Sequence, residues 1–457
     1  MRLSLCSSLL LLAAIITLSS CGGSRPSPIT PGPNKPGTTT KPNTPTTPPV
    51  KPGDKPSGNN NGTGGTTPSN PGTNTPQNKQ TTYKLALLLP FSTNQYTDGS
   101  ATLPDKNTIA LQYYAGMQLG FAAVSQMPNY PNFVVDVVDS QVSDAEFQQV
   151  LNTNTRLKQA QVILGPIRNS HVGLMANQAK ISRQIVVSPE SPTSELTEQN
   201  PYFLQTNPPL RAHCARIVQY LRSEKKRPAD QIVLVCKEKE ADRLPYFREA
   251  NLKYGTTALK EVIVPDASVN FDKIDFKKFI KPGQTTAFVM PSWAGSDWVL
   301  AFLSRLKQQK GNNTVEVYGM PQWADYEHLE PDLLTGLNVH ISSAKYIDRT
   351  SPEVQEFEQL FYEKFGTLPD DDAYAGYDVV KFTAALLQKY GLNFPEKMSE
   401  SGSFFPALTG GYYMRRVPVS NPSAPMDAAK PVLYDYLENI YVHILKFEQF
   451  KYQPVEP

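Results

Sequence analysis

The fold of this chain is decided by Val162-Ile-Leu-Gly-Pro-Ile-Arg-Asn-Ser-His-Val172, followed by Ile185-Val-Val-Ser-Pro-Glu-Ser-Pro-Thr193. Each stretch is a short β-branched apolar run that ends in Gly, Pro and Ser, and the first leads into a helical pattern over residues 172–179. This pattern predicts a buried strand, a polar loop, a helix and a second buried strand. In open α/β sheets such loops lie at the carboxyl ends of the strands, where ligands bind. The two stretches therefore predict a site for a small polar ligand.

The same alternation of strand and helix continues on both sides. Before these stretches, a buried strand is expected in Lys84-Leu-Ala-Leu-Leu-Leu-Pro-Phe-Ser92, a helix over 112–124, a strand over 133–139 and a helix over 144–157. After them, strands are expected over 231–236, 261–264, 287–290 and 314–318, with a helix over 297–309. No hairpin signal interrupts this order, so the sequence predicts an α/β fold with mostly parallel, doubly wound sheets. The roughly 375 residues involved are too many for one ordinary core and predict two lobes.

The N-terminus has the pattern of a secretory signal peptide over residues 1–20. One basic residue, Arg2, precedes an apolar core over 9–16 that is too short to span a bilayer. The following Leu18-Ser-Ser-Cys21-Gly-Gly resembles the lipobox of bacterial lipoproteins. That resemblance implies that Cys21 is acylated, with palmitate among the chains, and anchors the protein to a membrane. Gly at position 22 implies the periplasmic side of the outer membrane; the alternative is ordinary cleavage beside an incidental Cys.

Residues 21–82 form a Pro-, Thr-, Asn-, Gly- and Ser-rich tether after the lipidated Cys. Beyond Cys21 this tether has no aromatic residue, and Ile29 and Val50 are its large apolar groups, so it is predicted to be disordered. The whole chain has a formal net charge of +2. The signal peptide contributes +1 and the tether +5, so the remaining residues have a net charge near −4. This balance argues against a nucleic-acid partner.

Five motifs occur in a fixed order along the chain. They are a Leu-Leu-Pro-Phe strand end, a Tyr-Ala-Gly-Met-Gln-Leu-Gly helix, Leu-Gly-Pro-Ile with a following Ser, Val-Ser-Pro, and Asn200-Pro-Tyr-Phe-Leu-Gln-Thr-Asn207. Together they resemble the type I periplasmic-binding-protein superfamily. This superfamily includes the Leu/Ile/Val receptors of ABC transporters and the binding-protein-like domain of lipoproteins that activate peptidoglycan synthases. The resemblance runs from about Tyr83 to the C-terminus.

The resemblance implies two lobes, each with a mostly parallel doubly wound sheet, joined by a hinge that the chain crosses three times. Lobe 1 is expected to contain residues 83–207 and 350–391, and lobe 2 residues 208–349 and 392–457. Crossings are expected at Pro208-Pro209 and over 344–349, after which helices over 352–365 and 371–390 return to lobe 1. The tail, 441–447 and 450–455, is expected to close as a hairpin on lobe 2.

Ligand-binding candidates in lobe 1 follow the strand ends. They are Ser92, Arg168, Asn169, Ser170, Ser188, Ser191 and Thr193. Ser188, Ser191 and Thr193 match positions where receptors of the family hold the α-carboxylate and α-amino group of an amino acid, with turn formation around the prolines as the alternative. Asn169 and Ser170 could instead cap a helix. Glu190 departs from the small residues usual there and would oppose a carboxylate ligand.

The remaining ligand-binding candidates are aromatic and acidic. Trp293 and Trp323 each follow a strand end and could wall a cleft, or could anchor loops under a neighbouring helix. Tyr374 and Asp378 lie near the start of an expected helix. The acidic run at 370–372 before them matches a helix N-terminus, and it lacks the Gly and the distant Glu of a calcium loop.

Cysteines and histidines are too few and too scattered for catalysis or metal binding. Besides Cys6 in the signal peptide and the lipidated Cys21, the chain has Cys214 and Cys236, which are expected to form either a disulfide or two buried thiols. The five histidines share no metal-ligand spacing, and the catalytic motifs of hydrolases, nucleotide-binding enzymes and dehydrogenases are absent from the sequence. The sequence therefore predicts a protein that is not an enzyme, with no cofactor and no metal.

Two functions stay open. The first is an extracytoplasmic lipoprotein whose lobes close over an amino acid or a short peptide-like molecule and pass it to a transporter or sense it. The second is a protein-interaction module that its tether carries to a periplasmic partner such as a peptidoglycan synthase.

Overall fold

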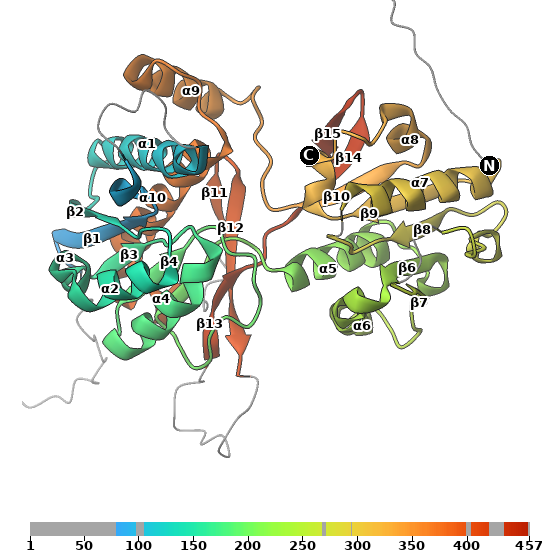
Figure 1. Ribbon diagram of the computed structural model, residues 1–457, viewed down its shortest axis with the longest axis horizontal. Helices are drawn as coiled ribbons and strands as arrows, with labels where there is room; N and C mark the ends of the chain where they lie inside the picture. Colours follow the sequence, from blue (N-terminus) through green and yellow to red (C-terminus); the bar gives the residue numbers. More distant parts are fainter. Residues whose placement is uncertain are drawn as a thin grey trace, which may run out of the picture. The chain divides into compact units, whose positions relative to one another are not determined.

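The computed structural model describes residues 79–96, 105–266, 271–293, 295–398, 404–419 and 434–455, except for the side chains of 105 and 106. The expected signal peptide, the lipidated Cys21 and nearly all of the tether lie outside the described residues. Within them, the strands form two separate sheets, each with its own helices (Figure 1). The expected α/β class with two mostly parallel sheets is confirmed.

The first sheet has the strand order β11-β12-β13-β5-β4-β3-β1-β2. Strands β1 to β5 and β13 run parallel, and β12 and β11 add an antiparallel edge. The strands are β1 (Thr82–Leu89), β2 (Asn132–Asp139), β3 (Val162–Leu164), β4 (Ile185–Ser188), β5 (Phe203–Gln205), β11 (Phe404–Ala407), β12 (Gly410–Pro418) and β13 (Tyr434–Asn439). The helices of this lobe are α1 (Asp105–Ser125), α2 (Asp144–Thr153), α3 (Thr155–Gln159), α4 (Asn169–Ser182), α9 (Pro352–Phe365), α10 (Asp371–Tyr390) and α11 (Phe394–Lys397).

Strand β1 shows why this sheet needs helices on both faces. Leu85, Leu87 and Leu89 belong to a core that α1 and α10 cover, whereas Ala86 and Leu88 belong to a second core that α2 and α4 cover. Because successive side chains of a strand point to opposite faces, a run in which every residue is apolar must be buried on both sides.

The second sheet has the order β15-β14-β10-β9-β8-β6-β7. Its parallel strands are β6 (Ile232–Lys237), β7 (Lys260–Val264), β8 (Thr286–Val289), β9 (Val315–Gly319) and β10 (Val339–Ser343). The antiparallel hairpin β14 (His443–Glu448) and β15 (Lys451–Pro454) closes one edge, as expected. The helices are α5 (Leu210–Gln219), α6 (Leu244–Leu252), α7 (Ser296–Lys310) and α8 (Pro331–Gly336). One apolar core runs through this lobe.

The chain passes between the two sheets three times, after β5, after β10 and after β13, as the resemblance implied. The lobe boundaries differ from those expected at the C-terminal end. Strands β11, β12 and β13 belong to the first sheet, so among the described residues of the expected 392–457 segment only the β14–β15 hairpin joins the second sheet. No local pattern indicates this arrangement, because β13 pairs with β5, a strand more than 200 residues away.

Two smaller expectations also changed. The helix expected over 144–157 is broken at Asn154, whose side chain accepts a hydrogen bond from Leu157 N and starts α3. Strand β10 was not expected, because His340 and two serines interrupt its apolar pattern. Among the described residues, no helix is both long and apolar enough to cross a bilayer.

Helices α1 and α10 pack unusually closely, side by side in Figure 1. A Cβ atom on Gly116 of α1 would lie 1.8 Å from the Ala373 carbonyl oxygen, and one on Gly376 of α10 would lie 2.1 Å from the Tyr113 carbonyl oxygen. Only glycine allows this approach. It places Tyr113 of α1 beside the start of α10, next to the hinge.

An ion-pair cluster links the lobes beside the hinge. The Glu438 carboxylate, fully buried at the end of β13, accepts hydrogen bonds from Arg211 Nη2 of α5 at 2.7 Å and from Arg415 Nε of β12 at 2.9 Å. Since α5 belongs to the second lobe and β13 to the first sheet, this contact holds the two together at the first and third crossings.

Candidate functional site

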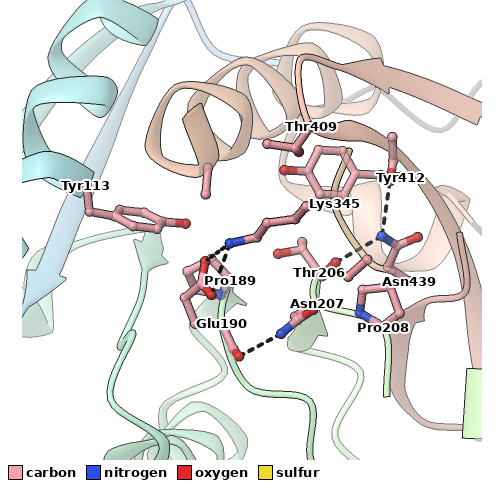
Figure 2. A pocket seen from close by; sticks show the side chains of 13 residues that line it. Tyr113, Pro189, Glu190, Thr206, Asn207, Pro208, Lys345, Thr409, Tyr412 and Asn439 are labelled. Atoms are coloured by element: carbon pink, nitrogen blue, oxygen red, sulfur yellow. Dashed lines mark hydrogen bonds and ion pairs between the residues drawn. The ribbon is translucent and has the colours of Figure 1, made fainter. Parts of the chain in front are cut away.

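A pocket lies where the hinge crossings meet the carboxyl ends of the first sheet's strands (Figure 2). It is partly open to solvent, and the space within it together with the solvent at its mouth amounts to about 340 Å³. Its lining comes from α1, the loop after β4, two crossing segments, α10 and the β11–β12–β13 region: Tyr113, Pro189, Glu190, Thr206, Asn207, Pro208, Ala344, Lys345, Ala375, Thr409, Gly411, Tyr412 and Asn439. Small ligands commonly bind in such a position in two-lobed α/β proteins.

The charged centre of the pocket is an ion pair between Glu190 and Lys345. Lys345 Nζ lies 3.2 Å from Glu190 Oε1 and 3.4 Å from Oε2, and both side chains are half-buried. Burial lowers the pKa of Lys345, but the charges of Glu190 and Asp372 outweigh it, so this pKa is raised. Burial and the Glu190 charge raise the pKa of Asp372 to about 6. The carboxylate that seemed to oppose an anionic ligand is therefore already paired.

Tyr113 contributes an unsatisfied polar group to the same pocket. Its side chain is fully buried and its hydroxyl has no hydrogen-bond partner. Figure 2 shows this hydroxyl pointing toward Lys345 and Glu190. Burial, followed by the Glu190 charge, raises the pKa of Tyr113 well above its ordinary value, so the phenol is neutral. Buried polar atoms are normally hydrogen-bonded, so an orphaned hydroxyl at a pocket wall is a place where a ligand or a water molecule bonds.

Asn439 fastens the crossing segments around the pocket. Its Nδ2 donates to the carbonyl oxygens of Thr206, at 2.9 Å, and Gly411, at 3.2 Å. Its Oδ1 accepts from the backbone N–H groups of Tyr413 and Tyr441. One buried amide thus ties the first crossing, the β12 strand and the third crossing together, so the pocket walls are bonded to the segments that cross the hinge.

Two expected ligand-binding residues of α10 have protein partners instead. The buried Asp378 carboxylate accepts from Leu408 N at 2.9 Å, Thr409 N at 2.9 Å and Thr409 Oγ1 at 2.8 Å. Burial raises the pKa of Asp378 to about 6 in spite of these bonds. The Tyr374 hydroxyl donates to Glu358 Oε1 at 2.6 Å and its ring is fully buried. Asp378 therefore positions the turn that carries Thr409 into the pocket wall, and Tyr374 fills the core.

The candidates after β4 shape the loop that presents Glu190. The Ser191 carbonyl oxygen accepts from Gln205 Nε2 at 2.6 Å, and the exposed Thr193 offers its own carbonyl oxygen to the same amide at 3.1 Å. Ser188 is fully buried and its hydroxyl has no partner. These residues flank Glu190 without lining the pocket, so their contact with a ligand stays a prediction.

The candidates at the other strand ends of lobe 1 lie outside the pocket. Arg168, Asn169 and Ser170 are exposed at the start of α4, where Arg168 Nε donates to Ser170 Oγ at 3.3 Å. Helix α4 has no side-chain cap, so the capping alternative is wrong. Ser92 is buried with a φ of 55°, and its backbone N–H donates to Asp139 Oδ1 at 3.0 Å, which fixes the turn after β1.

The two tryptophans of lobe 2 differ. Trp323 is buried in the core, and its Nε1 donates to the Ser292 carbonyl oxygen at 3.4 Å, as the loop-anchoring alternative requires. Trp293 is half-buried, and its Nε1 has no partner. Neither lines the pocket.

Both cysteines are buried free thiols, so the disulfide alternative is not found. Burial raises the pKa of Cys236 to about 11 and that of Cys214 further. In the described part of the chain, no three metal-ligating side chains cluster in a way that could hold an ion.

Sequence reasoning missed Tyr113, Lys345 and Tyr412, although one signal pointed toward Lys345. It lies in the segment over 344–349 where the chain was expected to recross the hinge, and residues at a crossing line the space between lobes. Tyr113 looked like an ordinary apolar residue of a helix.

Comparison with known proteins gives the following similarities. A family model described as "Periplasmic binding protein" matches residues 101–417. A putative branched-chain amino acid ABC transporter protein from Rhodospirillum rubrum has a TM-score of 0.58 at 12% identity, over 82% of this chain and 100% of that one. A branched-chain amino acid transporter protein from Rhodopseudomonas palustris has a TM-score of 0.55 at 16% identity, over 82% and 96%. An ABC transporter substrate-binding protein from Desulfitobacterium hafniense in complex with Leu has a TM-score of 0.50 at 15% identity, over 82% and 100%. No curated protein matches the sequence.

Proposed function

This chain belongs to the periplasmic binding protein family, and from that premise we propose that it binds a small polar solute, an amino acid or a short peptide-like molecule, at its hinge. Members of this family are extracytoplasmic substrate-binding proteins and not enzymes. The solved structures of similar fold include one with Leu bound.

The observation that carries this proposal is the hinge pocket with its unsatisfied hydroxyl and its ion pair. A molecule bound there touches the first lobe and two crossing segments, Asn207-Pro208 and Ala344-Lys345, at once. A ligand shifts a conformational equilibrium when it binds one state better than the other. Contacts on the hinge itself are suited to that, because the crossing segments take up the change when lobes rotate.

The proposal includes a lipid anchor. The lipobox-like sequence at Cys21 and the signal peptide before it support attachment to the periplasmic side of the outer membrane. Metabolic labelling with a palmitate analogue tests it. Label should enter the wild type and be absent from Cys21→Ser.

Ligand-induced thermal stabilisation tests solute binding. A panel of amino acids, peptides and muropeptides should contain a compound that raises the melting temperature, since a ligand at 100 times its Kd stabilises by about 2.7 kcal/mol. Ala344→Leu, which adds bulk to the pocket wall, should abolish the shift. The matched control is Ala301→Leu, at a half-buried position of α7 away from the pocket. A panel without any hit, or an equal loss in both variants, counts against the proposal.

The length and basic charge of the tether favour a second candidate, a tethered interaction module acting on a periplasmic partner such as a peptidoglycan synthase. In this candidate the tether acts through its length, since a flexible chain of about 60 residues spans about 45 Å on average. Deleting residues 25–78 while keeping Cys21 should abolish that activity and leave folding intact. Full activity of the deletion variant would rule this candidate out.

A further inference from the structure

The two members of the pocket's ion pair are held very differently. Glu190 lies in a loop with Pro189 before it and Pro192 after it, and Asn207 Nδ2 donates to its backbone carbonyl at 2.8 Å. The two prolines and this bond restrict the backbone of the loop, so the point from which the Glu190 side chain extends is set. Lys345 reaches the Glu190 carboxylate from the hinge crossing at the end of a four-carbon chain, which is longer and has more rotatable bonds than the Glu190 side chain. Of the two partners, Lys345 is therefore the one with more freedom to swing away.

Among the described residues, one acid, Glu190, and one base, Lys345, line the pocket, and two further carboxylates lie near enough to act on Tyr113. The carboxylates of Glu190, Asp372 and Asp378 all act on Tyr113. Fixed negative charge in a partly enclosed site attracts cations. The carboxylates around Lys345 therefore stabilise a positive charge at the position of its ammonium group.

The Tyr113 hydroxyl, which has no hydrogen-bond partner, is a second group beside Glu190 that can bind a ligand in the pocket. It is fully buried and points to the same spot as the Lys345 ammonium (Figure 2). A neutral phenol has acceptor lone pairs as well as a donor. An ammonium group placed between Glu190 and Tyr113 would give both oxygens a partner.

We propose that the ligand of this pocket carries a protonated amine, which replaces the Lys345 ammonium at the Glu190 carboxylate and donates to the Tyr113 hydroxyl. This inference rests on the proposed solute-binding function. The shared chemistry is the ammonium group, in a simple cationic amine or in a zwitterion. In a zwitterion, the released Lys345 can turn to the ligand's carboxylate.

A ligand with a carboxylate and no amine does not suit this site. Such a ligand would draw Lys345 toward its own carboxylate and leave the half-buried Glu190 carboxylate without its partner. Removing the partner of a buried charge costs binding free energy. It would also approach Glu190 and Asp372, which carry charge of the same sign. A cationic ligand meets no such penalty, because Lys345 can extend toward solvent.

Three probes that share the isobutyl group of leucine separate these cases: leucine, isopentylamine, which lacks the carboxylate, and 4-methylpentanoate, which lacks the amine. Calorimetric titration of the full chain should detect the two amines, and the carboxylic acid at least about 10-fold more weakly, since a hydrogen bond to a charged group contributes about 1.5–3 kcal/mol. Glu190→Gln should weaken both amines by about 10-fold or more on the same basis.

Lys345→Met gives a result of opposite sign. Without the internal competitor, isopentylamine should bind several-fold more tightly, whereas leucine should lose part of its affinity because its carboxylate has no partner. The matched control is Arg248→Met, which breaks the exposed Arg248–Glu261 pair in the second lobe and should change neither affinity. If Lys345→Met fails to fold, Glu190→Gln and the double variant Glu190→Gln/Lys345→Met carry the comparison, because neither leaves a buried carboxylate unpaired.

The outcomes distinguish a failure of the amine requirement from a failure of solute binding itself. Binding of 4-methylpentanoate as tight as that of leucine, or amine binding that survives Glu190→Gln, overturns the inference and leaves solute binding in place. If none of the three probes binds and no compound of the solute panel binds, both the amine requirement and the proposed solute binding are wrong. If a compound of the panel that lacks an amine binds and Ala344→Leu blocks it, solute binding stands and the amine requirement is wrong.

Discussion

Replacing Glu438 with Gln removes the charge from the carboxylate that joins the two lobes beside the hinge. Glu438 is fully buried in β13, and its partners are Arg211 Nη2 at 2.7 Å and Arg415 at 2.8 Å. Gln has nearly the same shape and keeps one oxygen acceptor. The change therefore tests the charge and the second acceptor, with little effect on packing.

The size of the effect follows from how far each arginine reaches solvent. Removing one partner of a buried ion pair costs about 3–5 kcal/mol. The Arg211 side chain is only 18% exposed, so this range applies to it, although Gln retains part of the hydrogen bonding. The Arg415 side chain is 37% exposed, and solvent screening reduces its share to below about 1 kcal/mol. We expect Glu438→Gln to lower the free energy of unfolding by about 3 kcal/mol.

Urea unfolding followed by circular dichroism measures this loss, with Glu261→Gln as the control. Glu261 pairs with Arg248 at a similar 2.7 Å, but the Arg248 side chain is 56% exposed, so its loss should stay below about 1 kcal/mol. A double-mutant cycle with Arg211→Met should also show strong coupling between Arg211 and Glu438. If Glu438→Gln and Glu261→Gln shift the unfolding midpoint equally, the claim that the Glu438 ion pairs hold the lobes together is refuted.

Three further predictions follow from burial and close packing. Burial and the Glu190 charge raise the pKa of Asp372 to about 6, so the folded state binds this proton more tightly than the unfolded chain, and stability falls as pH rises through about 6. Asp372→Asn should flatten the decline of the melting temperature across that pH, and an unchanged slope would contradict the assignment. Cys214 and Cys236 should react slowly with iodoacetamide in the native protein, because burial raises the pKa of both thiols. Both should react fully once the protein is unfolded without reductant, because both are free thiols. If neither reacts after unfolding, the two form a disulfide. Gly116→Ala should cost at least about 2 kcal/mol, because its methyl group would meet a backbone carbonyl of α10 at 1.8 Å, and a melting temperature like that of the wild type would disprove the tight α1–α10 contact.

The sequence by itself determined the fold class, most strand positions and two helix boundaries. Helices over 352–365 and 371–390 were expected with the bounds that α9 and α10 have. These signals are local: a helix shows its apolar period and its cap, and a buried strand shows an unbroken apolar run. The strand-end loop carrying Glu190 was recognised in the same way, because the apolar run Ile185-Val-Val ends in Ser-Pro.

Only the tertiary structure decided which residues share the pocket. Tyr113, Glu190, Lys345 and Tyr412 come from four distant parts of the chain, and nothing local marks Tyr113 as different from other buried tyrosines. Asp378 was expected to bind the ligand, but whether a buried carboxylate meets a ligand or a turn of its own chain depends on what the fold brings opposite it. The same holds for β13, whose pairing with β5 joins β12 and β11 to the first sheet, because strand pairing across more than 200 residues leaves no local trace.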